Sequence, residues 1–318
     1  MIPQTIMSDP MPLTAQAHGV YPIAATPFDA QGRVDFASLD RLTDFYLACG
    51  ASGLTILGIM GEAHKLEPDE ALAITQAVCA RARVPVIVGV SAPGFAAMRT
   101  LALGAMQRGA AGVMIAPLPA LRSDDQIIAY YAQAVEAIGA DIPFVIQDYP
   151  LALSVIMTPK VIRQIVSNHA SCVMLKHEDW PGLEKITALR GFQAEGSLRD
   201  LSILTGNGGL FLDFEMERGA DGAMTGYAFP DMLADVVRLS KVGQRDLAHD
   251  LFDAHLPLLR YEQQPGIGLA VRKYLLMRRG AMACDLQRKP GQELSPTARA
   301  EVDFLLARLA RHDARAKV

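Results

Sequence analysis

The chain has few cysteines, and their spacing excludes the two structures that cysteines usually build. There are four in 318 residues, at Cys49, Cys79, Cys172 and Cys284, and no two of them form a C-x-x-C pair. Cysteines this far apart predict neither a disulfide framework nor a zinc site. None stands in the polar, cationic sequence setting that favours a thiolate, so we expect each to be a small buried hydrophobic residue.

An excess of positive charge and long apolar runs are also missing. The net charge is -4, so no basic surface for nucleic acid is expected. No stretch approaches the roughly 18 uninterrupted apolar residues of a membrane span. Residues 1–17 have neither a cationic start nor an apolar segment, and we interpret them as a flexible N-terminal leader rather than a signal peptide. We therefore expect a cytoplasmic protein that binds neither nucleic acid nor a membrane.

The sequence does contain a regular alternation of short apolar runs and amphipathic segments. This alternation is typical of parallel strands that are joined by helices. The run 84–88, Val-Pro-Val-Ile-Val, is apolar throughout, as expected of a strand that is covered on both faces. Eight such runs lie at 19–25, 53–58, 84–90, 112–116, 143–147, 172–176, 201–205 and 222–226. Because eight strands close a barrel, we predict an α/β fold, a (β/α)8 TIM barrel, over residues 18–243.

After the eighth run the pattern changes to helices alone. Four helices are predicted, at 231–242, 245–260, 268–279 and 297–311. The first closes the barrel, and the other three form a C-terminal helical extension, residues 244–318, packed on the barrel. The segment 192–197 is ambiguous and is interpreted as a ninth short strand or a hairpin.

A repeated turn and several capping residues mark the helix boundaries. The segments 49–53, 108–112 and 218–222 share the pattern x-Gly-Ala-x-Gly, in which the first glycine suits a left-handed helix C-cap and the second begins a strand. Three copies of one turn indicate a single repeated architecture. The predicted N-caps are Asp35, Ser123 and Asp200, and Pro68 and Pro159 suit the first turn of a helix.

The segment 171–179, Ser-Cys-Val-Met-Leu-Lys-His-Glu-Asp, ends an apolar strand with a lysine and further ionisable residues. Burial disfavours an ammonium group, and a neutral lysine amine is the nucleophile that forms Schiff bases with carbonyl substrates. The alternative is a surface lysine that pairs with Glu178 or Asp179. Because the active site of a (β/α)8 barrel lies at the carboxyl ends of its strands, the position of Lys176 favours a catalytic role.

Other strand ends supply candidate partners for Lys176. Glu178 is two residues further along the strand and therefore points to the same side, where it can transfer protons or simply form an ion pair. Gln147 and Tyr149 are candidates to bind the substrate, although Tyr149 also suits packing beside Pro150. The predicted substrate-binding residues are Gly58, Met60, Gly61, Glu62, Gly206, Asn207 and Thr225. Backbone N–H groups of the two glycine-rich loops suit a carboxylate, but glycine serves a tight turn equally well.

Four sequence motifs occur in one order: Thr26-Pro27-Phe28 followed by Gly32, Val34 and Asp35; Gly58-x-x-Gly61-Glu62; Lys176; and Gly222-Ala223-Met224-Thr225. In this order the chain resembles the dihydrodipicolinate synthase and N-acetylneuraminate lyase family of class I, lysine-dependent aldolases. The resemblance implies a (β/α)8 barrel with a helical extension, a homotetramer or homodimer, and a lysine that forms an imine with pyruvate or another 2-keto acid. It assigns the imine to Lys176 and the substrate carboxylate to the loop 58–62.

The chain departs from the synthase and lyase members of that family at six positions. Ile59 and Met60 replace two hydroxyl residues, Gln147 replaces a catalytic tyrosine, Ala152 replaces an arginine, and Leu118-Pro119 replaces a tyrosine pair. The pattern is more similar to the branch that dehydrates 2-keto-3-deoxy sugar acids such as the arabonate derivative. The shared features are Gln147-Asp148 with Pro150, Glu178, Gly222 to Gly226, and Phe229-Pro230-Asp231.

From these observations we expect a lyase that dehydrates or cleaves a 2-keto-3-deoxy sugar acid, a small-molecule substrate, without a cofactor or a catalytic metal. Three alternatives remain open. They are a 4-hydroxy-tetrahydrodipicolinate synthase, a non-catalytic protein that binds 2-keto acids, and a metal-dependent enzyme with Asp148, His177, Glu178 and Glu195 as ligands.

Overall fold

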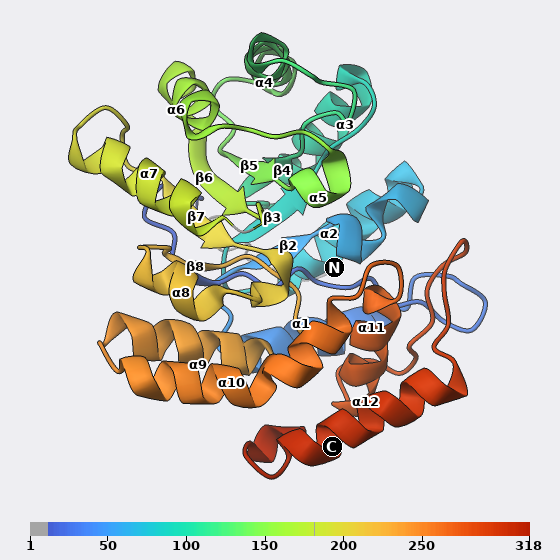
Figure 1. The fold of residues 1–318 in the computed structure, drawn as a ribbon. Coiled ribbons are helices and arrows are strands. Elements are labelled where there is room, and N and C mark those ends of the chain that lie inside the picture. Colours follow the sequence, from blue (N-terminus) through green and yellow to red (C-terminus); the bar gives the residue numbers. More distant parts are fainter. Residues whose placement is uncertain (1–11, 181) are drawn as a thin grey trace.

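Eight parallel strands form the centre of the protein, in a computed structural model that describes residues 12–180 and 182–318. Their order in the sheet is β1-β8-β7-β6-β5-β4-β3-β2. Figure 1 shows β2 to β8 with the helices around them. A parallel bridge between Ile23 and Thr55 joins the chain after β1 to β2 and so closes the barrel. The strands are β1 (Gly19–Val20), β2 (Leu54–Ile56), β3 (Val86–Gly89), β4 (Gly112–Ile115), β5 (Phe144–Asp148), β6 (Cys172–His177), β7 (Ser202–Thr205) and β8 (Gly222–Ala223). Each lies within or overlaps one of the eight predicted runs, so the predicted TIM barrel is confirmed.

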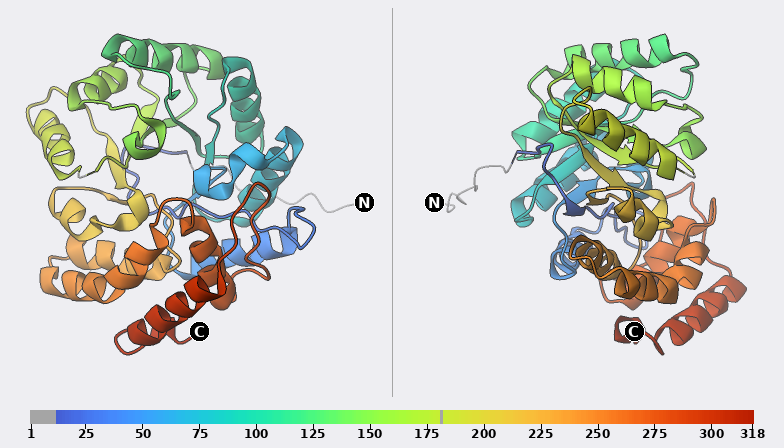
Figure 2. Two further views of the ribbon diagram at one scale, coloured as in Figure 1. Left: turned by 45° about the vertical axis from the view of Figure 1, so that its right-hand side comes forward. Right: turned by 60° about the vertical axis from the view of Figure 1, so that its left-hand side comes forward.

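Helices surround the strands and continue beyond the barrel (Figure 2). Those of the barrel are α1 (Phe36–Ala48), α2 (Pro68–Arg81), α3 (Phe95–Gln107), α4 (Asp124–Ile138), α5 (Pro150–Leu153), α6 (Pro159–Asn168), α7 (Leu183–Ala194), α8 (Leu212–Glu217) and α9 (Pro230–Lys241). The C-terminal helices are α10 (Arg245–Glu262), α11 (Gly268–Arg278) and α12 (Pro296–Leu309). Short 3-10 turns lie at Ile59–Gly61, Ala63–Lys65, Asn207–Gly209 and Ala314–Ala316. The predicted C-terminal helical extension is therefore present.

Most of the predicted helix boundaries are found. Asp35 and Ser123 cap α1 and α4 through their side chains, and Pro68 and Pro159 lie in the first turns of α2 and α6. The first glycines of the repeated turn, Gly50, Gly109 and Gly219, have φ angles of 84°, 89° and 95°. In this left-handed region glycine has no steric penalty, which explains the repeat.

Two boundary predictions are wrong. Asp200 caps no helix, because it lies in the segment that leads into β7. The segment 192–197 is neither a strand nor a hairpin, because α7 continues to Ala194. The N–H groups of Ser197 and Leu198 both donate to the carbonyl of Phe192, so these residues form the C-terminal turn of that helix.

The inside of the barrel is filled by apolar side chains from alternating positions of the strands. The buried cluster includes Tyr21, Ile23, Ile87, Met114, Val145, Met174, Leu204 and Met224. Side chains two residues apart on a strand point to the same face. Gln147 and Lys176 follow Val145 and Met174 by two residues, so they form the next layer, at the carboxyl ends of the strands.

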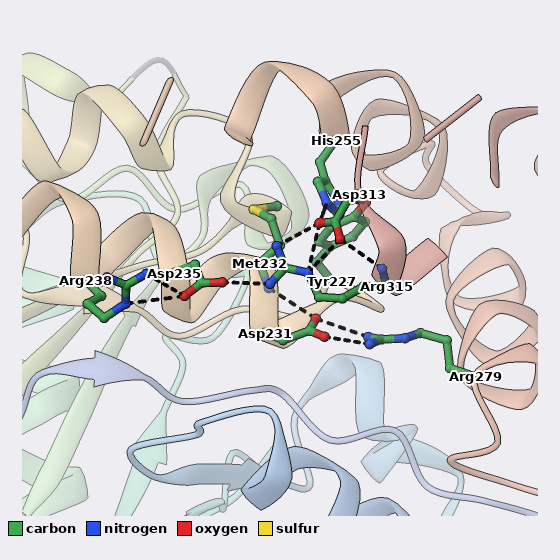
Figure 3. A network of polar contacts seen from close by, with 9 residues as sticks. All are labelled: Tyr227, Asp231, Met232, Asp235, Arg238, His255, Arg279, Asp313 and Arg315. Carbon is green, nitrogen blue, oxygen red and sulfur yellow. Dashed lines mark hydrogen bonds and ion pairs between the residues drawn. The ribbon is translucent and has the colours of Figure 1, made fainter. Parts of the chain in front are cut away.

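Buried polar contacts fasten the C-terminal helices to the barrel (Figure 3). His255 of α10 lies between the hydroxyl of Tyr227, 3.0 Å from Nδ1, and the carboxylate of Asp313, 2.9 Å from Nε2. Burial lowers the pKa of His255, although Asp313 opposes this shift. Ion pairs of the same network join Arg315 to Asp235 and Arg279 to Asp231.

The segment expected to be a flexible leader is described from residue 12 onwards. Leu13 is buried, and its N–H donates to the carbonyl of Ala111 over 3.1 Å. The carbonyl of Ala17 accepts a hydrogen bond from the hydroxyl of Ser202. Residues 12–17 therefore pack on the barrel, whereas residues 1–11 of the expected leader lie outside the described residues. Within the part of the chain that the structure describes, no helix has the length and apolarity needed to cross a membrane.

Candidate active site

Lys176, Glu178 and Gln147 form a hydrogen-bonded group at the end of β6. Lys176 and Gln147 are direct partners in the register of β6 and β5. Lys176 Nζ lies 2.8 Å from Glu178 Oε2, and Gln147 Nε2 donates to the same oxygen over 2.8 Å. The three residues are only 5%, 6% and 3% exposed, respectively. The structure thus brings three of the predicted site residues together, and their amine, carboxylate and amide groups suit nucleophilic attack, proton transfer and substrate binding.

Residues after β7 hold Glu178 in place. A side chain at Gly206 would overlap Cγ of Glu178, so only glycine leaves room for this carboxylate. Asn207 Nδ2 donates to the backbone carbonyl of Glu178 over 2.8 Å, and the N–H of Glu178 donates to the carbonyl of Asp148 over 2.8 Å. Gly206 and Asn207 were predicted to bind substrate, but their contacts in the structure are with Glu178.

Tyr149 lies at the start of α5 and is half-buried. Burial and the nearby carboxylate of Glu178 raise the pKa of its phenol, and Arg272 partly opposes this shift. Tyr149 therefore keeps its proton at neutral pH. It is a hydrogen-bond donor within electrostatic reach of Glu178.

The loop after β2 is a tight turn that uses only some of its backbone N–H groups. The N–H groups of Gly61 and Ala63 both donate to the carbonyl of Gly58, and the N–H of Glu62 donates to that of Ile59. The N–H groups of Ile59 and Met60, at the start of the 3-10 turn, have no partner inside the loop. The side chain of Met60 packs against the apolar interior of the barrel. Two backbone donors thus remain for a carboxylate, with no side-chain hydroxyl beside them.

The side chain of Glu62 contacts the C-terminal segment of the chain. Its carboxylate is fully buried and pairs with Lys273 of α11 through Oε1. Its Oε2 lies 2.8 Å from Lys65 Nζ and accepts from the N–H of Arg288 over 3.1 Å. Both oxygens are therefore occupied, which conflicts with the predicted contact between Glu62 and substrate. The residue instead ties the loop after β2 to the C-terminal segment.

Thr225 also conflicts with its predicted role. Met224 belongs to the buried cluster inside the barrel, so the next side chain points to the opposite face. The methyl group of Thr225 lies near Gly209, on the side of the surrounding helices. Its carbonyl accepts from the N–H of Ile23 over 2.8 Å, which continues the pairing of β8 with β1.

Arg272 of α11 was not predicted from the sequence. It is only 2% exposed, and its Nε donates to Glu262 Oε1 over 2.6 Å. Burial raises the pKa of Glu262, and Arg272 opposes this shift. A signal was present, because Arg272 and Lys273 are adjacent charges inside an otherwise apolar helical segment. Charges in such a setting predict buried partners, but the sequence does not indicate which.

The metal ligands of the alternative site are not brought together. Nδ1 of His177 lies 3.7 Å from Asp148 Oδ2, but Lys185 Nζ holds the same oxygen at 2.7 Å. Glu178 is on the opposite face of β6, and Glu195 follows the far end of α7. Across residues 12–180 and 182–318, no group of three or more His, Cys, Asp or Glu side chains is arranged to hold an ion.

The cysteines are free thiols, and burial raises the pKa of Cys79 and Cys172 to about 12 each. Both remain protonated at neutral pH, which agrees with a packing role. Only Cys172 is fully buried, however, whereas Cys49, Cys79 and Cys284 are half-buried, so the expectation that each cysteine is buried is met at one position.

Comparisons with known proteins agree with the resemblance seen in the sequence. The model of the dihydrodipicolinate synthetase family matches residues 16–309. The L-2-keto-3-deoxyarabonate dehydratase of Azospirillum brasilense is 30% identical over 310 residues, covering 93% of this chain and 96% of that protein. A 4-hydroxy-tetrahydrodipicolinate synthase of Rhizobium meliloti is 28% identical and covers 87% and 93%, respectively. A crystal structure described as dihydrodipicolinate synthase from Rhodopseudomonas palustris is 68% identical, with a TM-score of 0.93, and covers 94% of this chain and 99% of that one.

Proposed function

The chain belongs to the dihydrodipicolinate synthetase family, and we propose that it dehydrates or cleaves a 2-keto-3-deoxy sugar acid through a Schiff base on Lys176. Membership of this family, and with it an enzymatic activity as a lyase or dehydratase, follows from the comparisons. The substrate class and the roles of individual residues are the proposal. One observation carries it: the amine of Lys176 lies at the end of β6, within 2.8 Å of a carboxylate that an amide also contacts.

The other buried lysines have structural contacts, which supports Lys176 as the residue that forms the Schiff base. Lys65 and Lys273 both pair with Glu62, and Lys185 pairs with Asp148 and Asp179. These three contribute to ion pairs that hold loops and helices together. Lys176, in the inward-facing layer at the barrel mouth, has the position that attack on a bound ketone requires.

The proposed reaction begins when Glu178 accepts a proton from the ammonium of Lys176. The free amine attacks the keto carbon at position 2, Glu178 returns its proton to the carbinolamine hydroxyl, and loss of water gives an iminium. The iminium withdraws electrons, so the Glu178 carboxylate can accept a proton from carbon 3 to give an enamine. Glu178, protonated again, donates this proton to the hydroxyl on carbon 4, and the enamine expels it as water. Hydrolysis of the remaining imine releases the product and restores the amine.

Aldol cleavage uses the same iminium. In that case the hydroxyl on carbon 4 loses its proton, the bond between carbons 3 and 4 breaks, and an aldehyde leaves. A general base must then face that hydroxyl. Glu178 serves dehydration as an acid and cleavage as a base, so the outcome depends on which face of the substrate it meets.

The departures from the synthase pattern favour this reading over a 4-hydroxy-tetrahydrodipicolinate synthase. Gln147 lies beside Lys176 in place of the tyrosine expected of a synthase, and Ala152 replaces the expected arginine. Ile59 and Met60 leave the loop after β2 without side-chain hydroxyls. The missing tyrosine and hydroxyl groups are those that the resemblance assigns to proton relay in a synthase.

Borohydride trapping tests the proposal directly. Wild-type protein is incubated with pyruvate and sodium borohydride, and the intact mass is measured. We expect an irreversible adduct in the wild type, none in Lys176→Ala, and an unchanged adduct in Lys160→Ala, where an exposed lysine of α6 is removed. Absence of an adduct from the wild type would contradict the Schiff-base mechanism.

Product assays then separate the remaining readings. Turnover of a 2-keto-3-deoxy sugar acid supports the proposal, whereas condensation of pyruvate with aspartate semialdehyde supports the synthase. A protein that binds 2-keto acids in calorimetry but yields neither product is a non-catalytic binding protein. We further propose a cytoplasmic homotetramer or homodimer, and sedimentation at several concentrations tests the assembly.

A further inference from the structure

Arg272 carries a buried hydrogen-bond donor that the protein itself does not satisfy. Its Nε pairs with Glu262, but its buried Nη1 has no partner among the described residues. Buried donors are almost always paired, because an unpaired one loses its hydrogen bonds to water without replacement. A ligand oxygen at this position would satisfy Nη1.

The unpaired nitrogen lies over the end of β8, at the mouth of the barrel. A side chain at Gly226 would overlap Nη1, so glycine at this position leaves room for the guanidinium. Met224, two residues earlier, lies inside the barrel, and the hydrogen bonds of β8 with β1 and β7 continue through Met224 and Thr225. Gly226 therefore continues the inward face of the strand, and Arg272 approaches the mouth from α11.

The electrostatic setting of Tyr149 links Arg272 to the group around Lys176. Glu178 raises the pKa of this phenol and Arg272 lowers it, so both charges act on one hydroxyl group. Lys176–Glu178 lies at the end of β6 and Arg272 at the end of β8, so they border the same mouth from different sides.

A second unsatisfied donor comes from the same C-terminal region. Gln263, the residue after Glu262, has a buried Nε2 without a partner among the described residues. Its side chain fills the space that a side chain at Gly208 would need, beside the end of β7. An unpaired donor from the C-terminal region therefore lies at the carboxyl end of β7, and another lies at the carboxyl end of the neighbouring strand β8.

The charges around the mouth are already balanced. Lys176 pairs with Glu178, and Arg272 pairs with Glu262. A ligand group at Nη1 must accept hydrogen bonds, but it need not carry a negative charge. Hydroxyl oxygens meet this requirement without adding an unbalanced charge to a buried site.

We propose that Arg272, assisted by Gln263, binds the hydroxyl groups at the end of the substrate remote from the keto group. This inference rests on the proposed function, since it takes Lys176 as the point of attachment. The guanidinium would then set specificity for polyhydroxylated 2-keto acids over short ones.

The test compares a long and a short substrate in matched variants. Arg272→Lys keeps the positive charge beside Glu262 but removes the Nη donors, and Arg272→Met with Glu262→Met removes the pair as a unit. Arg278→Lys, at the exposed end of the same helix, is the control. Each is assayed with a 2-keto-3-deoxy sugar acid and by borohydride trapping of pyruvate.

We expect kcat/KM for the sugar acid to fall roughly ten- to a hundredfold in Arg272→Lys, mainly through KM, as for loss of a charged hydrogen bond. The pyruvate concentration that gives half-maximal trapping should change less than about twofold. Equal losses with both compounds, or no loss with the sugar acid, would overturn the inference. A larger loss with a 2-keto acid that ends in a second carboxylate would overturn the assignment to hydroxyl groups. If the wild-type protein traps no pyruvate, the proposed function itself fails. If the wild type traps pyruvate but the Arg272 variants behave like Arg278→Lys, only the inference about Arg272 fails.

Discussion

Lys176 Nζ and Glu178 Oε2 lie 2.8 Å apart, on side chains two residues apart along one strand. The ion pair that was the simpler reading of this stretch is therefore present, and it does not compete with catalysis. A carboxylate at this distance stabilises the ammonium in the resting protein and is also placed to accept its proton. The same contact supports both roles, and only kinetics can separate them.

Replacement of Glu178 by glutamine should separate binding from chemistry. Glutamine keeps the size and a hydrogen bond to Lys176 but cannot exchange a proton. We expect turnover of a 2-keto-3-deoxy acid to fall about 10²–10⁴-fold. The final extent of pyruvate trapping should be retained. Glu184→Gln, at an exposed carboxylate of α7, is the control, and equal turnover in both variants would exclude Glu178 as the proton donor.

A methyl group at Gly206 should misplace Glu178. The φ angle of Gly206 is −116°, so an effect of alanine comes from overlap with Cγ of Glu178 rather than from a left-handed backbone. We expect turnover to fall about a hundredfold, the usual cost of a shift of about 1 Å in a catalytic group. Gly191→Ala provides the matched control, because no atom lies within 4 Å of its added carbon. If Gly206→Ala retains full turnover, Glu178 does not need its present position.

The buried pair of Glu62 and Lys273 should stabilise the fold only as a pair. Lys273→Met leaves a buried carboxylate without its main partner, so the free energy of unfolding should fall by about 3–5 kcal/mol. Glu62→Gln in the same chain should restore much of that loss. Urea denaturation of the two single variants and the double variant measures the coupling. The control is Arg218→Met, which breaks an exposed ion pair with Glu184 and should lower the free energy of unfolding by no more than about 1 kcal/mol. An equally small loss in Lys273→Met would contradict this account.

Glu215 should make the protein less stable as pH rises towards neutrality. Burial raises the pKa of this carboxyl from 4.5 to about 7. Between these values the folded chain keeps a proton that the unfolded chain has lost, so the free energy of unfolding falls with increasing pH, by roughly 3 kcal/mol in total. Glu215→Gln should remove this fall, and thermal unfolding at pH 5 and pH 8 compares the two proteins.

Glu217 supplies a control of opposite sign on the same helix. Hydrogen bonds from Arg245, and then from His249, lower the pKa of Glu217. The ionised Glu217 carboxylate therefore stabilises the fold at pH values above the pKa that it has in the unfolded chain. This stabilisation is lost as the pH falls through the lower pKa of the folded state. Glu217→Gln should weaken the protein more at pH 8 than near pH 4. If Glu215→Gln gave the same pH profile as Glu217→Gln, the Glu215 carboxyl would be ionised in the folded state.

The sequence predicts those features that depend on local periodicity. Alternation along β6 places Met174, Lys176 and Glu178 on one face, and the barrel architecture then brings Gln147 beside them. The same rule, applied beyond β8, turns the side chain of Thr225 away from the mouth of the barrel. Met224 is the inward residue, so its neighbour faces the helices.

Features that depend on distant segments could not be predicted. Glu62 lies in the glycine-rich loop after β2, and its motif suggests a ligand site. Its partner Lys273 lies 211 residues further along the chain. Arg272 stands out in the sequence only as a charge in an apolar helical segment, and only the tertiary structure brings it to Gly226. The segment 192–197 was misread because its polar residues and Gly196 end a helix as readily as they form a hairpin.

Glu62 and Gly226 both contact residues of α11, near the C-terminal end of the chain. These contacts therefore determine when the site is completed during protein synthesis. All eight strands have left the ribosome once Ala223 has emerged, and domains generally fold from the N-terminal end as they appear. At that stage the loop after β2 still lacks Lys273 and Arg288, and the end of β8 still lacks Arg272. A nascent chain can therefore close its barrel while its mouth remains unfinished. The last helices make the final contribution to a site whose lysine was in place much earlier.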